Sequence, residues 1–227
     1  MCGRFNVASD PTARLFMLLV GEDVEIPDLY NVAPTDEAPV VRDRRDGREV
    51  ALLRWWLIPY WSKEPKTRYA MVNARAESLE RSRAFKGPFE RRRCIVPISG
   101  FYEWQTENGK KIPYYVRPPD EPGIALAGLW DRWRGEDETI ESFTIVTTKV
   151  HEKLEFLHDR MPVMLSVENA QRWLAAATDK DTLKAMLAPA IPYDLEVVPT
   201  STYVNNSRNK GIECLEITGN PRFIARD

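Results

Sequence analysis

Short runs of β-branched and aromatic residues fill the middle of the chain, and Gly, Pro, Asn and Asp separate them. Such runs are typical of β-strands, whose pleated surface accommodates branched and ring side chains. The segment 101–116 indicates a hairpin, because Asn108-Gly109 supplies the positive φ of a tight turn between aromatic strands. The runs predict strands at 38–42, 49–61, 94–105, 112–118, 123–133, 142–148 and 195–201.

Apolar residues recur at helical spacing between these runs. Ser9 or Asp10 can cap a first helix that has Pro11 at its first position and ends by Gly21. Strands and helices do not alternate regularly, so we expect an α+β fold, with one domain over 1–227 and a mostly antiparallel sheet or barrel-like core with peripheral helices. The remaining helical patterns cover 73–85, 151–157, 166–177 and 181–188.

Composition narrows the class of protein. The 227 residues suffice for one sizeable core, and they contain no run of about 20 apolar residues that would span a membrane. The first residues lack a secretory signal, so we expect a cytoplasmic protein. A net charge of -2 argues against coating of nucleic acid by bulk positive charge, although arginines cluster at 42–48 and 91–93. Cys2, Cys94 and Cys214 are odd in number and far apart, which indicates free thiols.

Cys2 is notable for its position. Removal of Met1 would leave a free α-amine and a thiol on adjacent carbons of Cys2. The amine titrates near about 8, so a usable fraction is nucleophilic at neutral pH. Such a 1,2-aminothiol condenses with an aldehyde to a Schiff base, and the thiol then closes a five-membered thiazolidine. The alternative is that Cys2 is a small packing residue.

Glu103 and His158 are the candidate acid–base residues. Alternation along the predicted strand places Glu103 on the same face as Phe101 and Gln105, where burial would raise its pKa. A solvated carboxylate is the alternative. His158 could donate or accept a proton, as imidazoles in general do near neutral pH, but it could equally be a packed imidazole four residues after Leu154 on a helix. The sequence has no carboxylates at ligand spacing around its histidines, so we expect no metal.

Two polar residues and one aromatic segment have both structural and functional interpretations. Asn73 could cap the helix over 73–85 or orient a reacting amine. Arg75 could cap, pair with Glu77, or bind phosphate. The aromatic segment 55–61 could belong to the core or form a surface on which bases stack.

Six blocks, in this order, resemble the SRAP family of SOS-response-associated peptidase proteins, which crosslink covalently to abasic sites in single-stranded DNA. The blocks are MCGR at the start, YNVAP at 30–34, WLIPYW at 56–61, NARAE at 73–77, RRCIVPISGFYEW at 92–104 and HDRMPV at 158–163. The resemblance implies that Cys2 is the nucleophile and that Asn73, Glu103 and His158 complete the catalytic group. It implies DNA contacts by Arg4, Pro34, Trp61, Arg75, Trp104, Thr147 and Arg160, with no metal and no cofactor.

The implied reaction is capture of the ring-opened deoxyribose aldehyde by Cys2. Glu103 would assist ring opening, His158 would exchange protons with the sugar oxygen or imine, and Asn73 would hold the amine. The implied partner is single-stranded DNA with abasic sites, including sites at junctions with duplex, bound by a monomer without membrane contact. In a bacterium the protein would associate with the nucleoid in the cytoplasm.

The chain departs from the family pattern in two places. Trp56 stands where the usual WGLIP has glycine, which puts the geometry of that loop in question, and Ile98 stands where alanine is usual. Two other functions stay open at this point. One is a thiol peptidase that uses Cys2, including mere self-processing of Met1, and the other is a non-covalent module for single-stranded DNA.

Overall fold

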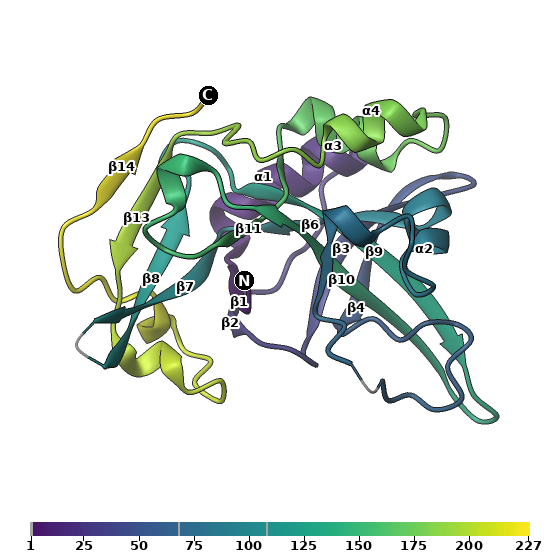
Figure 1. Cartoon of the computed structure of the whole chain (residues 1–227), viewed down its shortest axis with the longest axis horizontal. Coiled ribbons are helices and arrows are strands. Elements are labelled where there is room, and N and C mark those ends of the chain that lie inside the picture. The colour runs from purple at the N-terminus through teal and green to yellow at the C-terminus, as the bar shows by residue number, and fades with distance from the viewer. Residues whose placement is uncertain (1, 68, 108) are drawn as a thin grey trace.

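Two β-sheets, one of them closed into a barrel, form the frame of the protein (Figure 1). The computed structural model describes residues 2–67, 69–107 and 109–227. The first sheet is antiparallel, in the order β14-β13-β8-β7-β1-β2. Its strands are β1 (Arg4–Val7), β2 (Leu29–Val32), β7 (Gly100–Glu107), β8 (Lys110–Arg117), β13 (Leu195–Pro199) and β14 (Arg222–Ile224).

The second sheet runs β11-β10-β4-β3-β6-β9-β12, and pairing of β9 with β10 closes β10, β4, β3, β6 and β9 into a ring. Most pairs are antiparallel, but β10 pairs in parallel with β4 and with the short β5. The strands are β3 (Glu37–Arg44), β4 (Gly47–Trp55), β5 (Asn73–Arg75), β6 (Arg93–Ile98), β9 (Ile124–Arg134), β10 (Thr139–Lys149), β11 (Arg160–Pro162) and β12 (Met164–Leu165).

Helices cover the barrel. The α-helix α1 (Ser9–Val20) buries Leu15, Phe16 and Leu19, a helical stripe that packs on β3, β4 and β6, and it ends at Gly21, whose φ is 97°. Helix α3 (Val167–Leu174) packs on β6 and β9. The others are α2 (Lys86–Arg91), α4 (Lys180–Ala185) and the 3-10 turns η1 (Ala76–Ser78), η2 (Glu152–Leu154), η3 (Thr202–Asn205) and η4 (Ile212–Leu215).

The expected α+β class with a mostly antiparallel, barrel-like core is confirmed, as are the hairpin over 101–116 and the helices near 166–177 and 181–188. Asn108 of the hairpin turn lies outside the described residues. Among the described residues, no helix is long and apolar enough to cross a membrane.

Two helix predictions are wrong. Over 73–85 the chain forms β5 and the turn η1, because 73–75 pair with β10 and the long-range ladder outweighs local helical spacing. Asn73 is therefore a strand residue and caps no helix. Over 151–157 only η2 is helical, so His158 lies in a connection and not on a helix. The short helix α2 has no counterpart among the sequence predictions.

Candidate functional site

Cys2 lies at the seam between the two sheets. It precedes β1, which pairs with β7 so that Arg4 is opposite Tyr102 and Phe5 opposite Phe101, and extending this register toward residue 2 leads to 103–104. Across the seam, Asn73 Nδ2 of β5 donates a hydrogen bond to the carbonyl oxygen of Cys2 at 3.0 Å. Cys2 itself is fully buried. A strand of the barrel therefore fixes the backbone of a residue that belongs to the other sheet.

Glu103 is the buried acid of this seam. Its side chain lies on the face of β7 that alternation assigns to Glu103 and Gln105, and the residue is only 4% exposed. Burial raises the pKa of Glu103, and the charge of His158 lowers it in part. Burial also raises the pKa of the Cys2 thiol, and the negative charge of Glu103 adds to that effect. Glu103 is therefore within electrostatic reach of both Cys2 and His158, and the raised pKa of Cys2 favours the protonated thiol at neutral pH.

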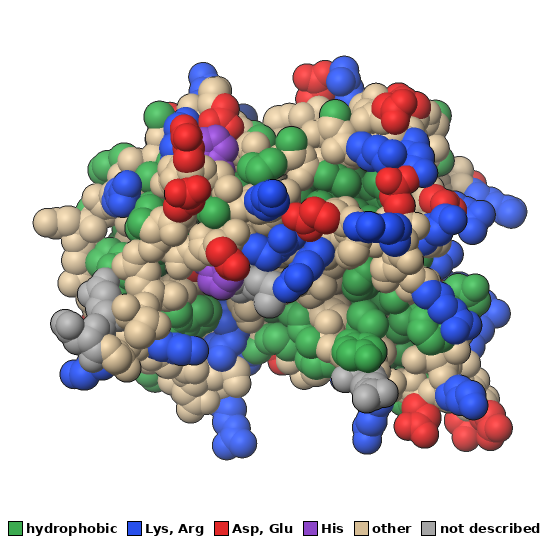
Figure 2. Space-filling model, in the orientation of Figure 1, with side chains coloured by type: hydrophobic (Ala, Val, Ile, Leu, Met, Phe, Trp, Pro, Cys, Tyr) green, Lys and Arg blue, Asp and Glu red, His purple; other side chains and the backbone are tan. Residues whose placement is uncertain are grey.

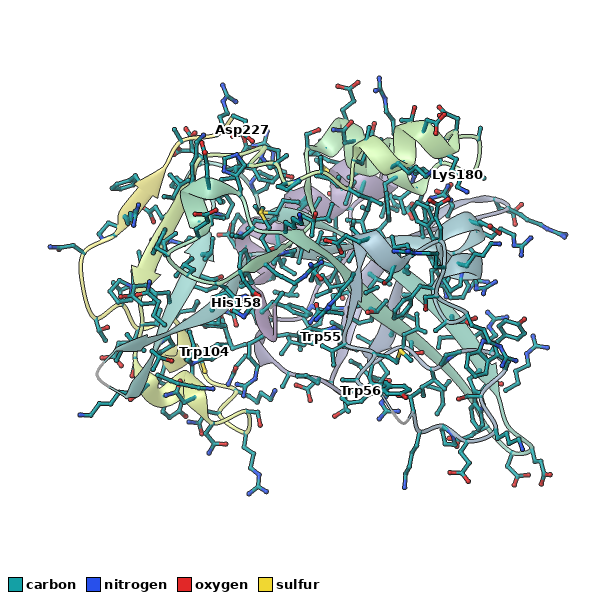
Figure 3. The ribbon with its side chains drawn as sticks, viewed as in Figure 1. Trp55, Trp56, Trp104, His158, Lys180 and Asp227 are labelled. Carbon is teal, nitrogen blue, oxygen red and sulfur yellow. The ribbon has the colours of Figure 1, made fainter. Side chains whose placement is uncertain are left out.

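His158 lies in the connection between η2 and β11, with a third of its side chain exposed (Figure 3). Its Nδ1 accepts a hydrogen bond from the backbone N–H of Arg160 at 3.1 Å. The Asp159 carboxylate also contacts Nδ1. Gln105, two residues after Glu103 on the same strand face, donates to the carbonyl of Phe156 and so ties this connection to β7.

The barrel contributes a basic edge beside His158. Strand β10 lies between β5 and β11, which sets Thr147 opposite Arg75 on one side and Pro162 on the other. Arg160 Nη2 donates to Thr147 O at 2.8 Å, and its guanidinium grips Glu77 through bonds of 3.1 and 3.0 Å. That hydrogen bonding lowers the pKa of Glu77. Figure 2 shows Lys and Arg side chains gathered near a histidine in the middle of this face.

A pocket of about 640 Å³ opens at this edge, next to His158. The side chain of Arg75 is exposed, whereas that of Thr147 is buried. Among the described residues no group of three or more His, Cys, Asp or Glu side chains is placed to hold a metal ion. The pocket is lined by Arg75, Lys149, Val150, Glu155, His158, Asp159 and Arg160.

On the opposite side of the seam, Arg4 and Trp104 face each other on β1 and β7. The Arg4 guanidinium carbon lies 5.7 Å from the centre of the Trp104 ring, and Trp104 Nε1 donates to Asn205 Oδ1 at 2.6 Å. Arg4 Nη1 donates to Asn31 Oδ1 at 2.7 Å and to Val204 O at 3.0 Å. Burial lowers the pKa of Arg4. These contacts occupy part of the Arg4 guanidinium and fix its orientation.

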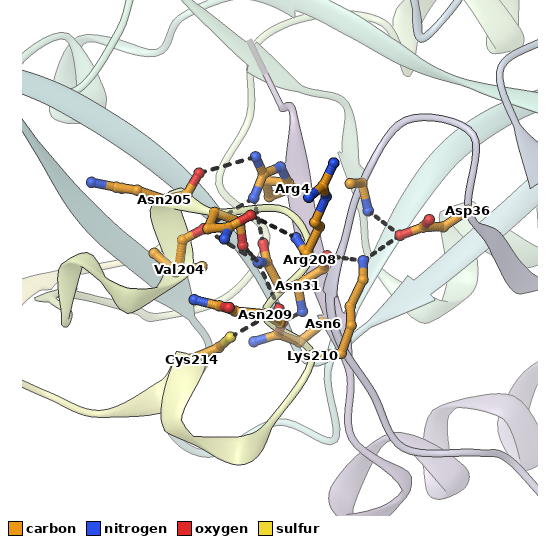
Figure 4. Close-up of polar contacts among 12 residues, drawn as sticks. Arg4, Asn6, Asn31, Asp36, Val204, Asn205, Arg208, Asn209, Lys210 and Cys214 are labelled. Carbon is orange, nitrogen blue, oxygen red and sulfur yellow. Dashed lines mark hydrogen bonds and ion pairs between the residues drawn. The ribbon is translucent and has the colours of Figure 1, made fainter.

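Asn31 is a residue whose role the sequence reasoning missed (Figure 4). It lies in the block YNVAP with φ 53°, a left-handed value that Asn tolerates better than most residues. Its Nδ2 donates hydrogen bonds to the carbonyls of Val204, Asn206 and Asn209 at 3.2, 3.0 and 2.9 Å. Its Oδ1 accepts a hydrogen bond from Arg4 Nη1. Asn31 therefore clasps the segment 201–217 to β2 and holds Arg4. The sequence signal for this role was the position of Asn31 within the block YNVAP at 30–34.

The remaining two predicted DNA contacts lie elsewhere. Pro34 follows β2 and is half-buried, and Trp61 follows the end of β4, is 37% exposed and carries the guanidinium of Arg83 over its ring at 4.2 Å. The aromatic segment 55–61 divides between both interpretations, because Trp55 is fully buried while Trp61 is exposed. Trp56 is half-buried and its Nε1 donates to Thr67 Oγ1 at 2.8 Å, so its ring is fastened to the loop.

The barrel and the sheet meet at the cysteine in second position, where an asparagine binds its backbone and a buried glutamate lies within electrostatic reach both of the cysteine and of a histidine. Comparison with protein families matches residues 1–207 to SOS response associated peptidase (SRAP), and the chain belongs to this family. The abasic site processing protein YoqW of Bacillus subtilis is 36% identical over 222 residues, with 95% of this chain and 99% of that protein covered.

A vertebrate relative and a solved structure extend the likeness. The abasic site processing protein HMCES of Xenopus tropicalis is 33% identical over 229 residues, covering 86% of this chain and 68% of that protein. The crystal structure of a protein from Bacteroides thetaiotaomicron superposes with a TM-score of 0.79 at 26% identity, over 96% of this chain and 98% of that one. The expected family is therefore confirmed.

Proposed function

We propose that the protein recognises abasic sites in single-stranded DNA and, once Met1 is removed, forms a thiazolidine crosslink between Cys2 and the ring-opened deoxyribose. The relatives' names support the abasic site as the target. The observation that carries the proposal is the hydrogen bond from Asn73 to the backbone of Cys2, beside the buried carboxyl of Glu103. The whole chain acts as one unit and as a monomer in the cytoplasm, and if the source is a bacterium it associates with the nucleoid.

The reaction needs a proton donor, an amine and a thiol, in that order. Glu103, whose pKa burial raises, supplies a proton to the sugar ring oxygen as the ring opens to the aldehyde. The Cys2 amine then adds to the aldehyde carbon, His158 exchanges the proton that leaves with water, and loss of that water gives the imine. The thiol then adds to the imine carbon, and its proton passes to the nitrogen, so the ring closes without an external reagent.

The raised pKa of the Cys2 thiol favours this order over a thiol peptidase. A peptidase depends on a thiolate, and reactive thiolates occupy exposed, electropositive surroundings. Cys2 is buried and next to a carboxylate. Imine formation requires only the amine, and the neutral thiol is sufficient for the ring closure that follows on a bound, adjacent carbon.

For the DNA itself, we propose that Arg75 and Arg160 face the backbone on the barrel side and Arg4 on the sheet side, with Trp104, Pro34 and Trp61 toward the bases and Thr147 holding Arg160. The cationic edge next to the pocket at His158 supports this arrangement. Abasic sites at junctions with duplex are a further substrate of the same site.

The test is a denaturing gel of the processed protein with an abasic single-stranded oligonucleotide. We expect a shifted band from the native chain without reduction, and from Cys2→Ala and Cys2→Ser a band only after borohydride reduction, because both variants keep the α-amine but cannot form the thiazolidine. A residue left in front of Cys2 should abolish the band by blocking the amine. Binding that disappears entirely on denaturation would support the non-covalent module and refute the crosslink.

A further inference from the structure

A second pocket lies on the barrel, and it shares no residue with the pocket at His158. It has a volume of about 720 Å³ and lies where the chain after β4, helix α2 and the end of β9 meet. None of the blocks that support the family assigns a reacting group to it. Its walls include Tyr60, Lys86, Arg91, Arg92, Trp130 and Arg134.

The pocket carries positive charge that the protein does not neutralise. Lys86 and Arg134 are exposed and have no ion pair among the described residues, and the nearest carboxylate oxygen of Glu90 is 4.0 Å from Arg91. In a chain whose net charge is -2, such a surplus in one concave place is a local feature and no consequence of composition. It suits an anionic ligand with several charges in a row.

The floor of the pocket is rigid and adds a further cation. Asp131, 2% exposed, accepts hydrogen bonds from the backbone N–H of Tyr60 at 3.0 Å and of Arg132 at 2.8 Å. Arg92 Nε lies 3.1 Å from Asp131 Oδ1 without the geometry of a hydrogen bond. Arg92 is thus held by charge against Asp131 with its Nε buried, while 24% of its side chain stays exposed to a ligand.

An exposed aromatic ring lies beside these cations. Tyr60 is 63% exposed, although its backbone is fixed by Asp131, and the Arg92 guanidinium carbon lies 5.9 Å from its ring centre. Trp61 follows at once in the chain, and Arg83, which covers the Trp61 ring, also lines the pocket. A nucleic-acid strand that passes Trp61 would therefore continue into this pocket. Cations alternating with open aromatic faces are the pattern that binds single-stranded nucleic acid.

We propose that this pocket is a second DNA subsite, which binds the phosphates of a single-stranded segment flanking the abasic nucleotide and stacks one of its bases on Tyr60. The inference rests on the proposed function, since it extends the same bound strand. It adds a defined footprint: the strand runs from the seam at Cys2, past Trp61, to the cations of α2 and β9. The chemistry recognised is a flexible phosphodiester chain with unpaired bases.

The test removes three exposed cations of the pocket together, as Lys86→Ala, Arg91→Ala and Arg134→Ala. The control removes three exposed cations elsewhere, as Arg14→Ala, Arg45→Ala and Arg226→Ala, so that both proteins have the same net charge. Affinity for intact oligonucleotides is measured across a salt series at two lengths, about 5 nucleotides, near the lower end of the roughly 4–16-nucleotide site sizes of single-strand binding folds, and about 20 nucleotides, above their upper end. Circular dichroism compares the folding of both variants with that of the native chain.

The pocket variant should bind the short oligonucleotide as the native chain does and lose affinity for the long one. Its plot of log K against log salt for the long strand should be shallower by about 2, because each phosphate contact contributes about 0.7 to the slope. Tyr60→Ala should weaken binding of the long oligonucleotide without changing the slope of log K against log salt. A loss that is equal for both lengths, or equal in the control variant, would overturn the subsite.

Two further results separate this inference from the proposed function. If the variant loses affinity only for strands whose flank is paired into duplex, the ligand is not single-stranded and the inference is wrong. Crosslinking of a short abasic oligonucleotide, which does not reach the pocket, is measured in parallel. Absence of that crosslink in the native chain refutes the proposed function, whereas an intact crosslink with no dependence on length refutes the subsite alone.

Discussion

Replacing Glu103 with glutamine should move stability and reactivity in opposite directions. The residue is 4% exposed, and burial is the largest cause of its raised pKa. Glutamine has the same shape but no charge to desolvate. We therefore expect Glu103→Gln to gain stability relative to the native chain at neutral pH and to lose reactivity.

The sign follows from proton linkage. An unfolded glutamate titrates near 4.5, and in the folded protein the pKa of Glu103 is higher. Between those two values the folded protein holds a proton that the unfolded chain has released, so the native chain loses stability as pH rises through that window. The stability difference between Glu103→Gln and the native chain should therefore grow from pH 4.5 upward and reach a plateau above the folded pKa.

The size of the plateau reports the burial cost. Burying a polar group with incomplete compensation costs about 1–3 kcal/mol in proteins, and one pKa unit corresponds to about 1.4 kcal/mol. Urea unfolding of both proteins across pH measures the difference, with the exposed Glu25→Gln as a control that should give a flat line. The crosslinking rate of Glu103→Gln should fall by about 10²- to 10⁴-fold, the usual contribution of a positioned acid or base. A flat difference for Glu103→Gln, or one that shrinks with pH, would refute the reasoning.

Two further substitutions test the frame of the site. Asn31→Asp keeps an acceptor for Arg4 but loses the three hydrogen bonds that the Asn31 amide donates to the segment 201–217. At about 0.5–1.5 kcal/mol per bond, the substitution should lower the free energy of unfolding in urea by about 3 kcal/mol and speed proteolysis within that segment. A stability equal to that of the native chain would contradict the role of Asn31 in holding this segment. Trp173→Ala should cost about 3–5 kcal/mol, because the ring is fully buried and its Nε1 donates to Cys94 O at 3.1 Å; an unchanged unfolding midpoint would contradict that.

Local patterns were sufficient to predict the longer strands and the class of fold, but they missed the short strands β1, β2, β5, β11, β12 and β14, and the strand expected over 49–61 ends at Trp55. The run 142–148 is β-branched or aromatic at all but one position, and 123–133 mixes aliphatic and aromatic residues with small ones; in the structure they form β10 and β9, which pair along most of their length. The first helix was readable from its apolar stripe and from Gly21. The expected capping side chain was not found, since the residue before the helix is Ala8, which makes no side-chain bond. Closure of the barrel was beyond such patterns, because it depends on β9–β10 and β4–β10 contacts that no local spacing encodes.

The surroundings of the candidate site were less predictable than its members. Alternation on β7 correctly paired Glu103 with Gln105 on one face, but nothing local indicated that Gln105 would hold the connection that carries His158. Arg4 and Asn31 depend on carbonyls about 200 and 173 positions away in sequence, at Val204. Contacts of that range are set by the tertiary fold, so a single sequence leaves them undetermined.

Asn73 illustrates both points, because its local interpretation fails and its actual contact is a long-range one. Judged locally, an asparagine ahead of a helical pattern is a cap, and that interpretation fails because 73–75 join β10 in parallel. The same pairing carries the Asn73 amide across the seam to the carbonyl of Cys2. Cys2 belongs by β1 to the sheet and by this bond to the barrel, so its amine is positioned only when both halves are in place. A reactive aminothiol at a flexible chain end would react with aldehydes indiscriminately. Under the proposed function, the Cys2 aminothiol is held at the seam with its thiol buried, so it would meet an aldehyde only where a bound DNA strand delivers one beside His158.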